Sequence, residues 1–264
     1  LILDSLNTGT PMVVTSANYD ARKINENKTD LAELVRPVTK WSVELDLPDQ
    51  IPSVMRRAFN EANSHPKGPV YVGFTSNALE GIAEMNIIPS APVHDAVRPD
   101  PEGIRAAANM LQDARSPLLI VGDRVSDDDG MGHAVELAEI VGMPVYQSRG
   151  AEVSFPTNHP QYLGVHSLRV ASDRESLKGY DVILTVGMDT FDELFYWGDI
   201  ILGENTRLIH IDPIPGRVGK TEPTDLGIIS NCKAALEMLK DVLKDTVNKE
   251  IANKLRKESI QLAS

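Results

Sequence analysis

Two hydrophobic patterns alternate along the chain. Short runs of consecutive apolar residues are typical of buried parallel strands, whereas apolar residues three and four positions apart indicate a helix with one face against a core. The first pattern predicts strands at 11–16, 38–45, 70–74, 117–122, 143–147, 181–187, 206–212 and 226–229. The second predicts helices at 1–6, 30–35, 51–62, 101–114, 130–141, 171–178 and 231–245. Helices and strands that take turns predict an α/β protein with parallel sheets covered on both faces.

The alternation is interrupted between residues 83 and 100, where prolines are frequent and no period is present. This composition is typical of an extended linker, and a chain of 264 residues is long enough for two units that each bury a core. We therefore expect an α/β unit at 1–82, a linker at 83–100 with the boundary near residue 95, and a Rossmann-like doubly wound domain at 101–246. Residues 247–264 are rich in Lys, Glu and Asn, and indicate a solvated helix or charged tail.

Composition excludes several classes of protein. A hydrophobic content of 42% with 24% charged residues is typical of a globular protein, and the net charge of −12 disfavours binding to nucleic acid. The sequence contains no apolar run long enough to cross a bilayer and no basic segment followed by an apolar one near its start, so we expect a cytoplasmic protein without membrane contact. The single Cys232 permits neither an internal disulfide nor a cysteine-based metal site.

Three segments in the first part of the chain form an ordered series. Residues 36–41 read Arg-Pro-Val-Thr-Lys-Trp, residues 58–62 read Ala-Phe-Asn-Glu-Ala at the end of a predicted helix, and residues 68–72 read Gly-Pro-Val-Tyr-Val. The series resembles the thiamine diphosphate-dependent decarboxylases and synthases. In that family the pyrimidine-binding domain closes with an Arg-Pro-x-x-Lys segment, an Ala-Phe-x-x-Ala helix and a buried Gly-Pro-Val strand.

Later segments keep the family's order up to about residue 245. They are Pro-Leu-Leu-Ile-Val-Gly at 117–122, Phe-Pro-Thr-Asn-His-Pro at 155–160, Leu-Gly-Val-His at 163–166 and Leu-Ile-His-Ile-Asp-Pro at 208–213. Among the branches of the family, benzoylformate decarboxylase and acetolactate synthase are the most similar. The resemblance implies that 1–82 is the C-terminal part of a pyrimidine-binding domain, that 101–246 is the central domain, and that 247–264 leads toward a missing domain.

The resemblance also implies a cofactor, a substrate and an assembly for the full-length enzyme: thiamine diphosphate with Mg²⁺, a 2-oxo acid, and a homodimer or homotetramer. The family places its cofactor-activating Glu before the segment that matches Leu1. Its diphosphate and Mg²⁺ motif, Gly-Asp-Gly followed by Asn, comes after the segment that matches residue 245. Neither motif is present in this sequence, so we expect a fragment that is inactive alone and has no metal site of its own.

Candidate cofactor-binding residues follow the predicted strands of the second unit, because ligands of open parallel sheets lie beyond the carboxyl ends of the strands. Gly122 is expected to let the backbone turn tightly after its strand. Asp212 is either an acceptor for a ribose hydroxyl or a solvated residue at a strand end. The Leu-Gly-Val-His segment and the segment that begins at Gly187 are similar to the flavin contacts of acetolactate synthases. The candidates are Gly122, Gly164, His166, Gly187 and Asp212.

A departure from the family pattern makes flavin doubtful. In acetolactate synthases the glycine is followed by an Arg-Phe-Asp-Asp-Arg series, whereas residues 188–193 here read Met-Asp-Thr-Phe-Asp-Glu and lack both arginines. A pyrophosphate on the helix that opens at Gly130 is disfavoured as well, because Asp127, Asp128 and Asp129 precede it and would repel phosphate. These three carboxylates are better explained as helix caps.

His159 is the candidate for proton transfer, since an imidazole can move a proton near neutral pH. The resemblance implies this role, because a histidine in a matching Phe-Pro-Thr-x-His-Pro loop assists protonation in the benzoylformate decarboxylase branch. A purely structural loop histidine is the alternative. Two other functions stay open for the second unit: a regulatory module that binds ADP, coenzyme A or FAD, and a spacer that supports subunit contacts.

Overall fold

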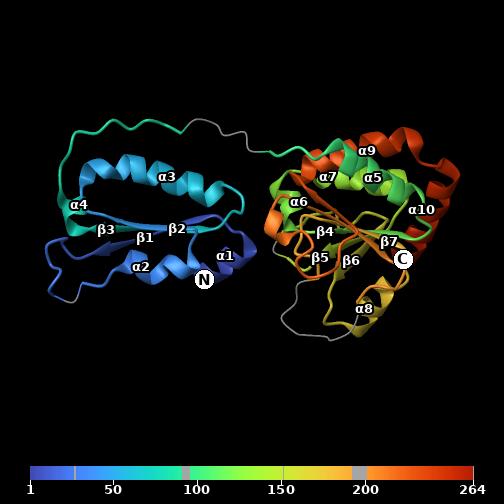
Figure 1. Ribbon diagram of the computed structural model, residues 1–264, viewed down its shortest axis with the longest axis horizontal. Helices are drawn as coiled ribbons and strands as arrows, with labels where there is room; N and C mark the ends of the chain where they lie inside the picture. The colour runs from blue at the N-terminus through green and yellow to red at the C-terminus, as the bar shows by residue number, and fades with distance from the viewer. Residues whose placement is uncertain (27, 91–95, 151, 192–200, 264) are drawn as a thin grey trace. The chain divides into compact units, whose positions relative to one another are not determined.

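The computed structural model describes residues 1–26, 28–90, 96–150, 152–191 and 201–263 (Figure 1). The chain divides into two compact units, Leu1–Asp95 and Ala96–Ser264. Each unit is a parallel β-sheet with helices on both faces, so the predicted α/β class is confirmed. Residues 81–90 and 96–100 form neither helix nor strand, and residues 91–95 of the predicted linker lie outside the described residues. Among the described helices, none is long and apolar enough to cross a membrane.

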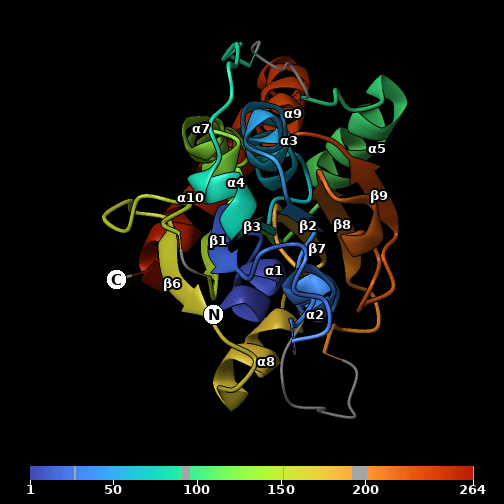
Figure 2. The same ribbon diagram turned by 90° about the vertical axis from the view of Figure 1, so that its left-hand side faces the viewer.

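The first unit has a three-stranded parallel sheet in the order β1-β3-β2. Helix α3 covers one face of this sheet, and α1 and α2 cover the other (Figures 1 and 2). The elements are α1 (Ile2–Thr8), β1 (Met12–Asn18), α2 (Leu31–Val35), β2 (Trp41–Leu45), α3 (Ile51–Asn63), β3 (Pro69–Thr75) and α4 (Ser76–Glu80), with short 3₁₀ helices at Arg36–Val38 and Pro48–Gln50.

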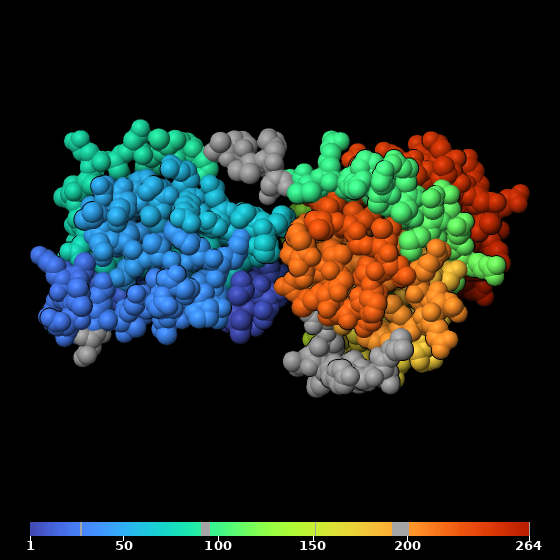
Figure 3. Space-filling view, viewed as in Figure 1, coloured from blue at the N-terminus to red at the C-terminus, as the bar shows by residue number. Residues whose placement is uncertain are grey.

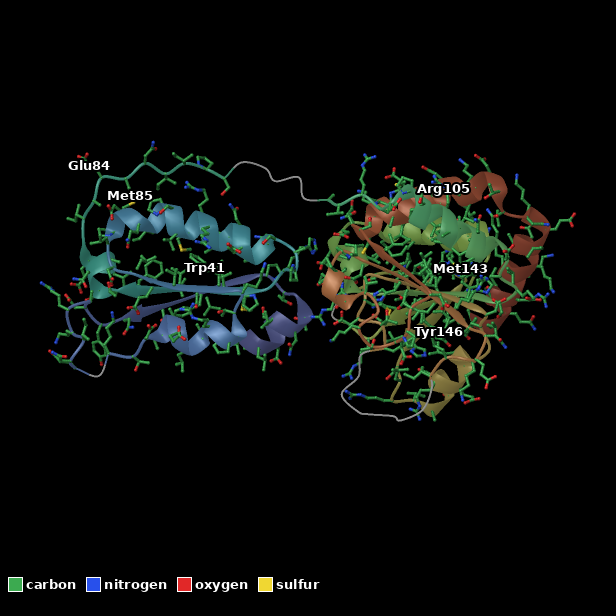
Figure 4. The ribbon with its side chains drawn as sticks, in the orientation of Figure 1. Trp41, Glu84, Met85, Arg105, Met143 and Tyr146 are labelled. Atoms are coloured by element: carbon green, nitrogen blue, oxygen red, sulfur yellow. The ribbon has the colours of Figure 1, made fainter. Side chains whose placement is uncertain are left out.

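The Arg-Pro-x-x-Lys-Trp segment ties α3 to the sheet. The Lys40 ammonium group donates to the backbone carbonyls of Glu61 and Ser64, with 2.6 Å to the oxygen of Ser64, and so satisfies acceptors at the C-terminal end of α3. Trp41 lies between the sheet and α3, and the Arg57 guanidinium stacks 4.4 Å from the centre of its ring (Figure 4). The motif therefore has a local structural role: it fixes the end of the helix over the first residues of β2.

The second unit has a six-stranded parallel sheet in the order β6-β5-β4-β7-β8-β9. Counted from the first strand of this unit, the order is 3-2-1-4-5-6, which is the strand order of a Rossmann fold. The strands are β4 (Pro117–Val121), β5 (Val145–Ser148), β6 (Tyr162–His166), β7 (Val182–Val186), β8 (Arg207–Asp212) and β9 (Leu226–Ile229). The predicted doubly wound sheet is confirmed.

Helices lie on both faces of this sheet, with α5, α7 and α9 on one face and α8 on the other (Figure 1). The strand β4 is buried on both sides, since Leu119 and Val121 pack beneath α5, α7 and α9 while Leu118 and Ile120 face the opposite core. In the space-filling view, the chain after β8 covers the surface beside α5 (Figure 3). The helices are α5 (Pro101–Gln112), α6 (Asp123–Asp127), α7 (Met131–Val141), α8 (Ala171–Leu177), α9 (Cys232–Thr246) and α10 (Lys249–Ala263), with a 3₁₀ helix at Pro215–Arg217.

Three described elements have no counterpart among the predicted ones: α4, α6 and β6. The segment predicted as a solvated helix or tail is the helix α10, although Ser264 lies outside the described residues. Ala252 and Ser259 of α10 are buried, the Ser259 hydroxyl donates to the carbonyl of Gly142 at 2.7 Å, and Arg256 pairs with Glu139 at 2.8 Å. One face of α10 is thus packed against the end of α7.

Candidate functional site

Three predicted cofactor-binding residues lie on neighbouring strands of the second sheet. Gly122 follows β4, Gly187 follows β7, and Asp212 is the last residue of β8. Between β4 and β7 the strand order reverses, and this is the point at which a Rossmann-like sheet binds its ligand. The carboxyl edge of β4, β7 and β8 is therefore the candidate site of this unit.

The two glycines are required by close backbone packing. The N–H of Gly122 donates to the carbonyl of Val186 at 2.9 Å, and a Cβ at Gly122 would lie 2.4 Å from the Cβ of Met188 and 2.5 Å from the carbonyl oxygen of Gly187. The predicted tight turn is present, because only Gly122 separates β4 from α6 and its carbonyl accepts from the N–H of Val125 at 3.0 Å. Its φ of −122° and ψ of −177° are extended backbone, so the turn itself does not require glycine. Gly187 does need glycine for its conformation, since its φ is 66°.

Arg124 connects the three strand ends. Its Nε and Nη2 atoms each lie 2.8 Å from Oδ2 of Asp212, and Nη2 also donates to Oδ1 of Asp189 at 2.9 Å. Arg217 donates to the other oxygen of Asp189 at 2.6 Å, and the backbone N–H of Ile214 donates to Oδ1 of Asp212 at 2.9 Å. Asp212 is fully buried, so the alternative of a solvated strand-end residue is wrong. We call Arg124, Asp189, Asp212 and Arg217 the carboxyl-edge network.

Burial shifts the pKa values of one acidic and one basic group at this edge in opposite directions. It raises the pKa of Asp212 to about 6, and the positive charge of Arg124 opposes this change. Burial also lowers the pKa of His210 to about 4. The Nε2 atom of His210 lies 3.1 Å from the carbonyl oxygen of Met188, and its Nδ1 accepts from the N–H of Gly219 at 3.4 Å. His210 is therefore neutral and Asp212 ionised near pH 7.

Gly164 and His166 lie on the edge strand β6. The pairing between β5 and β6 shifts register beside Gly164, whose φ is 109°, so this glycine permits a β-bulge. The His166 ring is buried, edge-on to Tyr146 with 5.3 Å between ring centres, and its Nε2 lies 3.1 Å from the carbonyl oxygen of Asp173. Tyr146 points to the side of the sheet that carries α8 (Figure 4). Burial lowers the pKa of His166, which is a packed residue of this aromatic cluster.

His159 lies at the opposite edge of the sheet from the network. It precedes β6, and because β6 runs parallel to β5 it lies near the amino ends of these strands. The Nε2 atom of His159 is 3.6 Å from a carboxylate oxygen of Glu139, its Nδ1 accepts from the N–H of Gln161 at 3.3 Å, and its ring packs edge-on against Phe155. The side chain is 12% exposed. The structure does not bring His159 together with Gly122, Gly187 or Asp212.

Asp128 contacts the start of a helix other than the predicted one, since the N-cap of α7 is Gly130, which has no side chain to cap it. Oδ2 of Asp128 accepts from the N–H of Cys232 at 2.6 Å, at the first residue of α9. Asp129 pairs with Lys233 at 2.9 Å. The acidic run thus connects the turn before α7 to the start of α9.

Sequence reasoning missed Arg124, Asp189 and Arg217, the charged groups that dominate the candidate site. The available signal was position, since Arg124 is the third residue after β4 and Asp189 is the third residue after β7. Asp192 and Glu193, the last residues of the segment compared with the flavin-binding pattern, lie outside the described residues. In the described part of the chain, no group of three or more His, Cys, Asp or Glu side chains could hold a metal ion.

Comparison with known proteins gives one family. Residues 104–239, just over half the chain, match the family described as "Thiamine pyrophosphate enzyme, central domain". The chain is 28% identical to an acetolactate synthase of Mycobacterium leprae, over 79% of this chain and 34% of that protein. It is also 28% identical to a benzoylformate decarboxylase of Pseudomonas aeruginosa, over 87% of this chain and 44% of that protein.

A solved structure extends the likeness over nearly all of the chain. A thiamine diphosphate-dependent 4-hydroxybenzoylformate decarboxylase of Rhodococcus jostii RHA1 is similar with a TM-score of 0.81 and 28% identity, covering 94% of this chain and 48% of that one. The chain spans less than half the length of each of these relatives.

Proposed function

Because the chain belongs to the thiamine pyrophosphate enzymes, we propose that it is part of a 2-oxo acid decarboxylase or carboligase similar to benzoylformate decarboxylase, and that it is inactive alone. In this proposal residues 1–82 are the C-terminal part of the pyrimidine-binding domain and residues 101–246 are the central domain. Residues 83–100 link the two, and 247–264 lead toward a further domain. The observation that carries the proposal is a likeness to the 4-hydroxybenzoylformate decarboxylase that covers 94% of this chain and so includes both units.

Thiamine diphosphate supplies the electron sink for decarboxylation in the complete enzyme. Apart from His159, the described residues of this chain provide scaffold: the first unit presents the carboxyl ends of β1, β2 and β3, and contacts of Arg124 tie strand ends together at the carboxyl edge of the second unit. The absence of both arginines from 188–193 supports the decarboxylase branch over a flavin-dependent synthase. For the complete protein we propose a cytoplasmic homodimer or homotetramer that requires Mg²⁺.

His159 is the residue that we propose for proton transfer in the complete enzyme. The support is chemical: its imidazole is partly accessible and its Nε2 lies 3.6 Å from the carboxylate of Glu139. In the complete protein, His159→Gln should lower kcat and alter the pH profile of kcat. The matched variant is His133→Gln on α7, another partly buried histidine, whose Nδ1 lies 3.2 Å from Nζ of Lys240. An unchanged pH profile in His159→Gln would assign this histidine a structural role.

A nucleotide-binding module is the second candidate function, and the strand order of the second sheet favours it. Gly122, Gly164, His166, Gly187 and Asp212 would line a site for ADP, coenzyme A or FAD. The contacts of the carboxyl-edge network argue against this candidate, because they occupy the groups that a nucleotide would need.

The decisive experiment compares the complete protein from the source gene with the 264-residue chain. Both are assayed for CO₂ release from benzoylformate and from pyruvate, with thiamine diphosphate and Mg²⁺ present. We expect turnover by the complete protein that disappears without thiamine diphosphate, and no turnover by the chain alone. A complete protein without thiamine-dependent turnover of either 2-oxo acid would contradict the proposal, as would an active 264-residue chain.

A further inference from the structure

We propose that the carboxyl-edge crevice of the second unit is closed from within by the side chains of Arg124 and Asp123, and that this Rossmann-like sheet consequently binds no nucleotide cofactor. The inference concerns the crevice beside β4 and β7 and is independent of the catalytic activity proposed above. It assigns the carboxyl-edge network a structural function: the network ties strand ends together in the place where related sheets hold a ligand.

The backbone donors at the first turn are already used. In a Rossmann-like sheet a pyrophosphate accepts hydrogen bonds from N–H groups where the first strand meets its helix. At this position the N–H of Gly122 donates to Val186, the N–H of Arg124 donates to the carbonyl of Gly187 at 3.1 Å, and the N–H of Val125 donates to Gly122 at 3.0 Å. The first two donors join the end of β4 to the end of β7, and the third closes the turn from β4 into α6, so these three N–H groups are not available to a phosphate.

A carboxylate lies at the same helix start. Asp123 is the first residue of α6, and its Oδ1 accepts from the N–H of Glu152 at 3.0 Å. The loop after β5 packs directly on this side chain, because a Cβ at Gly150 would lie 2.2 Å from the same oxygen. A phosphate placed here would meet a negative charge, and it could enter only if the loop were displaced.

Arg124 is not available to a phosphate either. Its guanidinium is paired with both Asp189 and Asp212, and only 14% of its side chain is exposed. Asp212 is the strand-end carboxylate that could accept from a ribose, but Oδ2 is bonded to Arg124 and Oδ1 to the N–H of Ile214. Asp189 is likewise engaged through both oxygens, by Arg124 and Arg217. Each described charged group of this network thus has its partner inside the protein.

Ligand binding gives the first test, with the 264-residue chain and FAD, ADP or coenzyme A as probes. At 1 mM, a ligand with a dissociation constant of about 10 μM would raise the melting temperature by about 6 °C. We expect no rise with any of the three probes and no heat of binding by isothermal titration calorimetry. A rise of this size, with saturable heat, would overturn the inference.

Substitution of Arg124 gives the second test, because a network that ties the strand ends together must stabilise the second unit. We expect Arg124→Ala to lower the melting temperature by about 10 °C, since it leaves buried Asp212 without its cation. Hydrogen exchange should quicken at the carboxyl ends of β7 and β8. The matched control is Arg105→Ala, an arginine on α5 that is 61% exposed (Figure 4), which should shift the melting temperature by less than about 1 °C.

If Arg124→Ala does not fold, Arg124→Lys carries the test, because lysine keeps the charge but not the planar fork that reaches two carboxylates. Its effect should be strongly non-additive with that of Asp189→Asn, measured as a double-mutant cycle of melting temperatures. If the two substitutions lower the melting temperature additively, or if Arg124→Lys is as stable as the wild type, the inference that Arg124 stabilises the strand ends is overturned.

Discussion

Gly122→Ala tests the geometry at the centre of the second sheet. The substitution adds one methyl group where β4 meets β7. That methyl carbon would lie 2.4 Å from the Cβ and 2.8 Å from the Cα of Met188, and 2.5 Å from the carbonyl oxygen of Gly187. All three contacts are far shorter than the roughly 3.5–4.0 Å at which carbon atoms attract.

The cost follows from which atoms must move. Inserting a methylene into a packed core costs about 1–3 kcal/mol when side chains can adjust. Here the obstacles are atoms of the backbone and a Cβ, which move only if the end of the β4–β7 ladder opens. We therefore expect Gly122→Ala to lower the free energy of unfolding of the second unit by at least about 3 kcal/mol.

Gly132→Ala is the matched control. It lies in the first turn of α7, and a Cβ there would meet no atom within 4 Å. Alanine should raise the free energy of unfolding by about 0.5–1 kcal/mol, because glycine loses more backbone freedom in a helix. Urea unfolding followed by far-ultraviolet circular dichroism compares the two variants, and hydrogen exchange at β4 and β7 assigns the loss to this unit. A Gly122→Ala protein within 1 kcal/mol of the wild type would refute the reasoning.

Three further predictions follow from single contacts. The buried His210 has a pKa of about 4, below its ordinary 6.5, so its stabilising contribution is complete above pH 6.5 and falls by about 3 kcal/mol as the pH drops to 4. The His210→Gln variant should not show this fall in stability. The raised pKa of Asp212 has the opposite effect on the pH dependence, but it acts equally in the wild type and in the variant. Lys40→Met should destabilise the first unit by about 2 kcal/mol in urea unfolding followed by Trp41 fluorescence, because the carbonyls at the end of α3 lose a charged donor. The thiol of Cys232, whose pKa is raised by burial, should react with a thiol reagent only after unfolding.

Each of these predictions has a contrary result. An equal pH dependence of the unfolding free energy in His210→Gln and the wild type would show that His210 is not buried as a neutral group. The free energy of unfolding of Lys40→Met is compared with that of Arg36→Ala, which removes an exposed ion pair with Glu33. If the Lys40 variant loses no more free energy than the Arg36 variant, the contacts of Lys40 at the end of α3 do not stabilise the unit. Rapid labelling of native Cys232 would mean that the start of α9 opens readily.

The sequence pattern predicted the fold because most strands are buried on both faces. The run 117–121 contains only apolar residues and proline, so it is recognisable from the sequence alone as a buried strand. The strand β6 is different: it is at the edge of the sheet, carries a bulge at Gly164 and exposes Val165, so no continuous apolar run marks it. Helix α6 has five residues, three of them charged, which is too short for a periodic pattern.

The candidate site was predictable only in part. Topology gave the positions of Gly122, Gly187 and Asp212, because carboxyl ends of neighbouring parallel strands meet at one edge. The network itself depends on contacts between Arg124 and residues 65 and 88 positions later in the chain, which no local pattern encodes. The location of His159 required the pairing of β5 with β6, since only the register shows which edge of the sheet its loop occupies.

Binding of thiamine diphosphate tests the central claim most directly. Isothermal titration calorimetry with thiamine diphosphate and Mg²⁺ is performed on the 264-residue chain and on the complete protein from the source gene. We predict saturable binding by the complete protein and none by the chain, whose described residues offer no metal-binding cluster and whose sequence has no Gly-Asp-Gly motif. Tight, Mg²⁺-dependent binding by the 264-residue chain, or none by the complete protein, would contradict the account.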